Sequence, residues 1–242
     1  MLNNKKLLII ISSIFVIIEL TLGVLVQITS GNLNTIVSFG SVVLAFIYSI
    51  IVITKTKDAI LTSIGLFFTI CADIFLVVLY PRIQDLAMVF FSITQIAYFL
   101  RIINLQKNQK LRLIHIIIRC VTIVIALIAT IIVLKEKTDF VSLISLFYYA
   151  NLVINLIFSF LMDEKNILFS IGLICFACCD LLIGFDIMAS SYIDLKEGTL
   201  FYFLANPGFN FAWIFYVPSQ LLIALSTRKI SLNKKSPLNE WF

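Results

Sequence analysis

Eight apolar segments, each about 20 residues long or longer, make up most of the 242-residue chain. An α-helix needs about 20 consecutive apolar residues to cross the hydrocarbon core of a bilayer. We therefore predict an all-α integral membrane protein with eight transmembrane helices. The predicted helices cover residues 7–28, 35–54, 59–80, 85–104, 112–134, 139–161, 166–189 and 200–226.

The amino-acid composition agrees with this class. Hydrophobic residues form 61% of the chain and charged residues 13%, whereas about 25% of the residues in a soluble domain are charged. This composition excludes an ordinary soluble enzyme, a disordered protein and a nucleic-acid-binding domain. The apolar segments leave little chain between them, so we expect one membrane domain over residues 1–226 and a short basic cytoplasmic tail over residues 227–242.

The basic residues between the segments predict how the chain is oriented, because cytoplasmic loops are enriched in Lys and Arg. With a cytoplasmic N-terminus, 13 basic residues fall on the cytoplasmic side and four on the other, and Arg119 lies inside the fifth helix. The larger set is Lys5, Lys6, Lys55, Lys57, Arg101, Lys107, Lys110, Arg112, Lys165, Arg228, Lys229, Lys234 and Lys235; the smaller is Arg82, Lys135, Lys137 and Lys196. We predict a multi-pass protein of the cell membrane with both termini in the cytoplasm.

A short repeat relates the two halves of the chain. The sequence Ser-Ile-Gly-Leu occurs at 63–66 and again at 170–173, and the same offset of 107 residues carries Asp73 onto Asp180. Both copies begin helices that start on the cytoplasmic side, which is the arrangement of parallel repeats. We therefore predict two parallel four-helix repeats, over about residues 1–110 and 111–226, around a central polar cavity.

Two aspartates are the main candidates for chemistry. Asp73 and Asp180 each lie about 14 residues into a predicted helix, roughly 21 Å from its cytoplasmic end and so at or beyond the midplane. A carboxyl group at this depth is costly and usually has a function. Glu19, in the first helix, is a third intramembrane acid and is either a substrate-binding residue or the partner of another helix.

Other polar residues form stripes that face the predicted cavity. Asn and Tyr in membrane helices often serve only to bond neighbouring helices, and that reading stays open here. The candidate substrate-binding residues are Glu19, Gln95, Tyr98, Tyr148, Asn151, Asn155 and Gln220. We expect Arg119 to extend towards the cytoplasmic surface, and we place the second and fifth helices, which have the fewest polar residues, nearer the lipid. No metal or cofactor is expected.

The segments around the two aspartates resemble the YhhN family of membrane proteins, which includes the lysoplasmalogenases. GLFFTICADIFL (65–76) and CFACCDLL (175–182) are similar to the two acidic motifs of that family, TQIAY (94–98) to its "AH-x-x-Y" motif, and YVPSQLL (216–222) to its closing motif. The order, the spacing and the eight-helix count agree. Three positions depart from the pattern: Gln95 stands for the family's histidine, Ala72 for a glycine and Cys179 for a serine.

The resemblance implies hydrolysis of the vinyl ether bond of a lysoplasmalogen, a single-chain ether phospholipid that reaches the site from the bilayer. Two nearby carboxyl groups are suited to that reaction, since one proton shared between them provides both an acid and a base. Two alternatives remain at this stage. One is a family member that has kept the fold and lost catalysis, and the other is a proton-coupled transporter or lipid-binding membrane protein.

Overall fold

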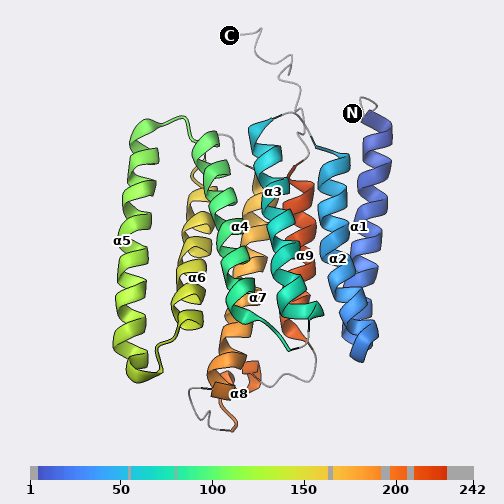
Figure 1. Ribbon diagram of the computed structural model, residues 1–242. Coiled ribbons are helices and arrows are strands. Elements are labelled where there is room, and N and C mark those ends of the chain that lie inside the picture. Colours follow the sequence, from blue (N-terminus) through green and yellow to red (C-terminus); the bar gives the residue numbers. More distant parts are fainter. Residues whose placement is uncertain are drawn as a thin grey trace.

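The computed structural model describes residues 5–53, 56–79, 81–162, 166–191, 197–205 and 210–227. Within these ranges the chain forms a bundle of helices that run in alternate directions (Figure 1). The elements are α1 (Lys5–Ile28), α2 (Gly31–Ile51), α3 (Lys57–Asp73), η1 (Ile74–Val78), α4 (Gln84–Leu105), α5 (Gln109–Leu134), η2 (Lys135–Lys137), α6 (Phe140–Ser159), α7 (Ile167–Ser191), α8 (Leu200–Ala205) and α9 (Phe211–Leu225).

Seven of these helices are long and apolar enough to cross a membrane, which confirms the all-helical membrane architecture. The predicted eighth segment, 200–226, differs from the prediction. It contains the short helix α8 and the 15-residue apolar helix α9, and residues 206–209 between them lie outside the described ranges. The start of α1 and the end of α9 lie at the same end of the bundle (Figure 1).

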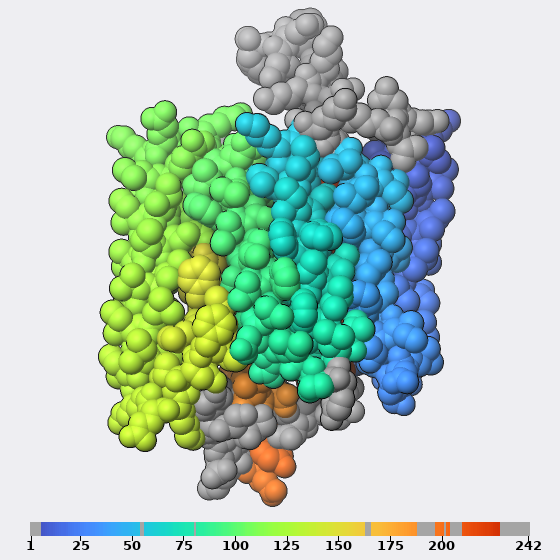
Figure 2. Space-filling model, in the orientation of Figure 1, coloured from blue at the N-terminus to red at the C-terminus, as the bar shows by residue number. Residues whose placement is uncertain are grey.

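Helix α5 lies at one edge of the bundle and α1 at the other (Figure 1). The apolar side chains exposed along α5 are those of a lipid-facing helix, and Figure 2 shows this helix forming one flank of the molecule. The prediction that α2 also lies near the lipid is wrong, because α2 packs against α1, α3 and α9. Its buried small residues explain the difference, since small side chains let helices approach closely; they are Ser38, Ser41, Ala45 and Ser49.

Local sequence signals set where the two helices at the α5 edge begin. Asn108 caps α5 by accepting hydrogen bonds from the backbone N–H groups of Lys110 and Leu111. Asp139 and Ser142 cap α6 reciprocally, each side chain accepting a backbone N–H from the other residue. The hydrogen bonds from Ser142 lower the pKa of the Asp139 carboxyl, so it stays ionised as a cap.

Two close helix contacts occur at positions related by the 107-residue offset. An added Cβ at Gly65 in α3 would lie 2.2 Å from the Tyr98 ring of α4, and one at Gly172 in α7 would lie 2.8 Å from Ile223 of α9. Both glycines therefore let a pair of helices approach more closely than any side chain would allow.

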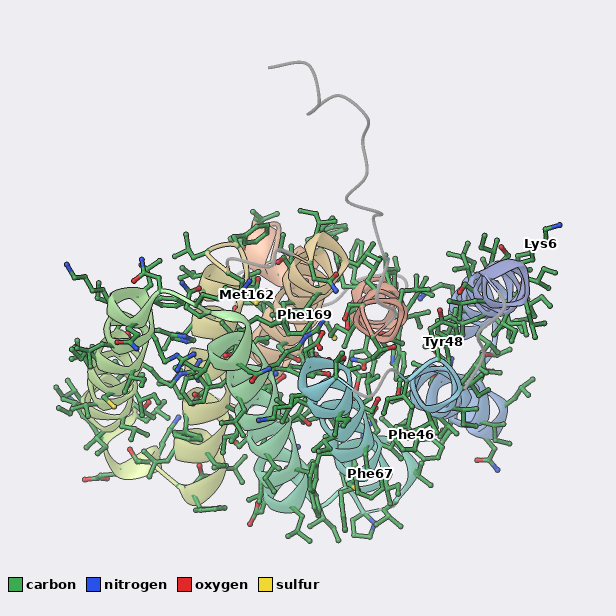
Figure 3. All side chains as sticks on the ribbon, turned by 90° about the horizontal axis from the view of Figure 1, so that it is seen from above. Lys6, Phe46, Tyr48, Phe67, Met162 and Phe169 are labelled. Atoms are coloured by element: carbon green, nitrogen blue, oxygen red, sulfur yellow. The ribbon has the colours of Figure 1, made fainter. Side chains whose placement is uncertain are left out.

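A second pair of contacts follows the same offset. Ser12 and Tyr48 share a 2.8 Å hydrogen bond between α1 and α2, and 107 residues later Arg119 donates to Asn155 at 2.5 Å between α5 and α6. In the view along the bundle, Tyr48 and Phe169 lie among the helices, whereas Lys6 points away from them (Figure 3).

Candidate functional site

Each of the two predicted aspartates accepts a hydrogen bond from a tyrosine on a neighbouring helix. Tyr216 of α9 donates to Oδ2 of Asp73, the last residue of α3, at 2.7 Å. Tyr148 of α6 donates to Oδ2 of Asp180 in α7. A phenol O–H is a directional donor, so each tyrosine fixes the orientation of one carboxyl group.

The tyrosines of the two tyrosine–aspartate pairs contact the same aromatic side chain. The ring of Phe176 contacts both tyrosines edge-on, with centroid distances of 6.4 Å to Tyr148 and 5.6 Å to Tyr216. Asp73 is buried, whereas Asp180 is only partly buried. The structure therefore brings the two acids into one interior region of the bundle.

Asp73 is followed directly by an irregular helical turn. Over η1 the helix widens, and the N–H of Leu79 donates to the carbonyl oxygen of Ile74, five residues earlier, at 2.9 Å. Such π-type turns are rare and often occur at functional sites, because they turn a side chain out of the regular helical register. The apolar run after Asp73 gave no sign of this turn in the sequence.

A buried arginine is the centre of a second polar cluster. Arg119 of α5 donates to the side-chain oxygens of Asn151 and Asn155 on α6 and to Nε2 of His115. Its guanidinium also lies 4.1 Å from the ring centroid of Phe99 in α4. The expectation that Arg119 reaches the cytoplasmic surface is wrong: the residue is 7% exposed, because two asparagines one helical turn apart supply acceptors inside the bundle.

Gln95 and the two asparagines belong to this arginine cluster. Asn155 donates from Nδ2 to the side-chain oxygen of Gln95 at 2.9 Å and to its backbone oxygen at 2.8 Å. The side-chain oxygens of Asn151 and Asn155 both point to Arg119. Two of these candidate substrate-binding residues therefore bind the arginine directly, and Gln95 is linked to it through Asn155. Of the predicted set, only Tyr148 is hydrogen-bonded to an aspartate in the part of the chain that the structure describes.

The remaining three candidates lie in other contacts. Glu19 of α1 is fully buried and accepts a 2.6 Å hydrogen bond from Ser41 of α2. Tyr98 packs over Gly65 and against the ring of Phe169. Gln220 donates to the hydroxyl of its neighbour Ser219 at 3.1 Å. The contacts of Glu19 and Tyr98 join neighbouring helices, which is the structural role that stayed open for them, whereas the hydrogen bond of Gln220 stays within α9.

Sequence reasoning missed Tyr216 and Phe176 as site residues. Tyr216 precedes Gln220 by four residues and so shares its helical face, which was the available signal. Phe176 is one phenylalanine among 22 in the chain, and nothing in the sequence distinguishes it. Among the residues that the structure describes, no group of three or more His, Cys, Asp and Glu is placed to hold a metal ion.

Comparison with known proteins identifies the family. No curated protein and no solved structure matched the chain. The model of the YhhN family matches residues 33–227, a range that includes both aspartates, both of their tyrosine partners and the arginine cluster. The chain therefore belongs to the YhhN family.

Proposed function

We propose that this protein hydrolyses the vinyl ether bond of a lysoplasmalogen, releasing a fatty aldehyde and a glycerophospho-base, with Asp73 and Asp180 as the catalytic residues. The observation that carries the proposal is the pair of tyrosine-bound carboxyl groups whose tyrosines contact the same ring, that of Phe176. Membership of the YhhN family, which includes lysoplasmalogenases, supports the choice of reaction.

The chemistry needs one proton donor and one proton acceptor. A carboxylic acid protonates the vinyl carbon farther from the ether oxygen, and the electrons of the double bond form the new C–H bond. The resulting oxocarbenium ion takes up water, which the second carboxylate deprotonates. The hemiacetal that forms then breaks its C–O bond to give the aldehyde and the glycerol hydroxyl. Tyr216 and Tyr148 keep the two carboxyl groups oriented during these steps.

We further propose that the bundle consists of two parallel repeats, with their shared region as the substrate cavity and both chain ends in the cytoplasm. The contacts of Gly65 with Tyr98 and of Gly172 with Ile223 support the repeat. Helix packing supports it too. In the proposed repeat, α2 corresponds to α6 and α4 to α9, and the packing of α4 on α6 has its counterpart in the packing of α9 on α2. A site between the halves suits a single-chain lipid that enters from the bilayer.

The test is aldehyde release from lysoplasmalogen by purified protein. Asp73→Asn and Asp180→Asn should each reduce the rate by about a hundredfold or more, because positioned acid–base groups contribute roughly 10²–10⁴-fold. Asp186→Asn is the matched control: Asp186 lies on α7 as Asp180 does, but is exposed, and its replacement should leave the rate unchanged. Full activity in either of the first two variants refutes the proposed roles.

A second candidate, a family member without catalysis, rests on Gln95. Glutamine stands where the family motif has histidine, and its side-chain oxygen is held by Asn155. If this candidate is correct, the natural protein releases no aldehyde and Gln95→His gains activity, since an imidazole nitrogen accepts the same hydrogen bond and also transfers protons. Substrate-dependent proton flux into liposomes without product indicates a carrier instead.

A further inference from the structure

Arg119 is a cation inside the bundle whose described partners are all uncharged. Its Nη atoms donate to Asn151, Asn155 and His115. Because a guanidinium only donates hydrogen bonds, Nε2 of His115 accepts here, and the ring adds no negative charge. The Nε atom of Arg119 is buried and has no hydrogen-bond partner. The site therefore holds a positive charge and an unused donor.

Burying a charge is unfavourable unless another charge or a full set of hydrogen bonds compensates it. Two amide oxygens and one imidazole nitrogen compensate Arg119 only in part. Gln95 adds a second unused donor, because its Nε2 is also buried without a partner. Its side-chain oxygen is bonded to Asn155. An anion with several acceptor oxygens would satisfy the charge and the donors together, and a phosphate has that chemistry.

The arginine cluster and the Asp180 pair lie along the same stripe of α6. Tyr148 bonds Asp180, and Asn151 and Asn155, three and seven residues further on, bond Arg119. At 1.5 Å per residue, the two asparagines are about 4.5 and 10.5 Å from Tyr148 along the helix axis. In a glycerophospholipid the first ether oxygen is five bonds from phosphorus, on the order of 6 Å, and each end has a hydrogen-bond length to add. By this length, one lipid headgroup could reach from one cluster to the other.

We propose that Arg119, held by Asn151 and Asn155, binds the phosphodiester of a lysophospholipid while its ether bond lies at the aspartates. This inference rests on the proposed function and adds to it the requirement for a phosphate. It also gives the substrate a direction: the phosphate points to the end of the bundle where α6 ends, and the ether lies nearer the middle of α6.

The first test uses the natural protein and measures binding, not turnover. The probes are a 1-O-alkyl lysophosphocholine, whose saturated ether cannot react, the corresponding 1-O-alkylglycerol, which lacks phosphate, and inorganic phosphate. We expect the lysophospholipid to bind at least about tenfold more tightly than the alkylglycerol, because charge-assisted hydrogen bonds are the stronger ones. Equal affinities overturn the proposal. Inorganic phosphate binding as tightly as the lysophospholipid also overturns it, since the site then takes the free anion.

Variants then test whether the preference for the phosphate-bearing lipid depends on Arg119. Asn155→Asp gives Arg119 a carboxylate in place but removes the Nδ2 donor to Gln95, so the unfolding temperature is measured beside binding. The folded variant should lose the preference for the phosphate-bearing lipid. Arg119→Gln should lose it as well, with alkylglycerol affinity unchanged. The matched control is Arg112→Gln: Arg112 lies two turns earlier on α5 and donates to backbone oxygens of Ile103 and Gln106. A preference that survives both Asn155→Asp and Arg119→Gln, or is lost equally in Arg112→Gln, contradicts the proposal.

These binding results separate this proposal from the proposed reaction. If aldehyde release depends on both aspartates but phosphate makes no difference to binding, the reaction stands and the headgroup site is wrong. If phosphate-dependent binding needs Arg119 but Asp73→Asn and Asp180→Asn leave aldehyde release intact, the headgroup site stands and the catalytic roles are wrong.

Discussion

At the scale of single residues, the site pairs each acid with a phenol from another helix. Tyr216 and Tyr148 are both buried, and each directs its O–H to one carboxyl oxygen. A carboxyl group that must exchange a proton with a substrate carbon needs a fixed direction, because proton transfer requires contact at hydrogen-bond distance. In the proposed reaction, the tyrosines would provide this direction without adding a charge to the membrane interior.

This arrangement predicts that Tyr216→Phe and Tyr148→Phe each lower the rate of aldehyde release by about tenfold or more, the range expected for losing a hydrogen bond to a charged group. The control is Tyr48→Phe, which removes a hydrogen bond between buried Tyr48 and Ser12. All three variants should lose similar thermal stability, and only the first two should lose activity. A loss of activity equal in all three would mean that the tyrosines act through the fold alone.

The residue scale also shows how far the sequence could identify the site. Asp73 and Asp180 could be found because an acid in an apolar run is rare and the 107-residue offset connects them. Their partners could not, since hydrogen bonds between helices depend on how the helices rotate and pack, and apolar runs do not fix either. Arg119 was misplaced for the same reason: its acceptors Asn151 and Asn155 are on another helix.

At the scale of helices, close packing at two glycines positions the two acids. Gly65 lies two turns before Asp73 on α3, and Gly172 lies about two turns before Asp180 on α7. Each lets its helix approach α4 or α9, respectively, and α9 carries Tyr216. Small residues at such contacts are the usual way that membrane helices pack, because lipid offers no hydrophobic driving force between them.

Gly172→Ala tests this packing. Its new Cβ would meet Ile223 at 2.8 Å and the carbonyl oxygen of Ser219 at 3.2 Å, so α7 and α9 must separate, at a cost of about 1–3 kcal/mol. Gly184→Ala, on the same helix, meets nothing within 4 Å and should leave the unfolding temperature in detergent unchanged or raise it. Equal behaviour of the two variants would show that the contact at Gly172 does not hold α7 against α9.

Helix existence was predictable from the sequence, and helix shape was not. The seven long helices follow from segment length and apolar content, which backbone hydrogen bonding inside a bilayer makes a strong constraint. The widened turn after Asp73 and the separation of segment 200–226 into α8 and α9 depend on local backbone geometry. The run after Asp73 is apolar and contains no turn signal, so its pattern did not distinguish the widened turn from a regular helix. Segment 200–226 does contain a helix-breaking signal at Asn206, Pro207 and Gly208, and the prediction of a single helix there gave more weight to the apolar content of the segment.

At the scale of the whole molecule, charge and helix direction together predict an orientation. The start of α1 and the end of α9 share one end of the bundle (Figure 1), which requires an even number of crossings. Arg101, one of the 13 basic residues assigned to the cytoplasmic side, is fully buried and donates to Ser226 just beyond α9. Arg101 therefore anchors the end of α9 inside the protein and does not act as a loop charge. Without Arg101, the predicted cytoplasmic side still carries many more basic residues than the other side.

Helix α5 offers the cleanest test of this orientation, because one apolar segment, Gln109–Lys137, separates a basic residue at each end. Lys110→Cys should react with a membrane-impermeant maleimide only after cells are permeabilised, and Lys137→Cys should react in intact cells, because positive charge is retained on the cytoplasmic side. The unsubstituted protein, with its five natural cysteines, measures the background. The reverse pattern inverts the orientation, and labelling of both positions in intact cells shows that α5 does not cross the membrane. The predicted pattern would place the proposed phosphate site at Arg119 nearer the cytoplasmic leaflet, and the proposed lipid substrate would then enter from that leaflet.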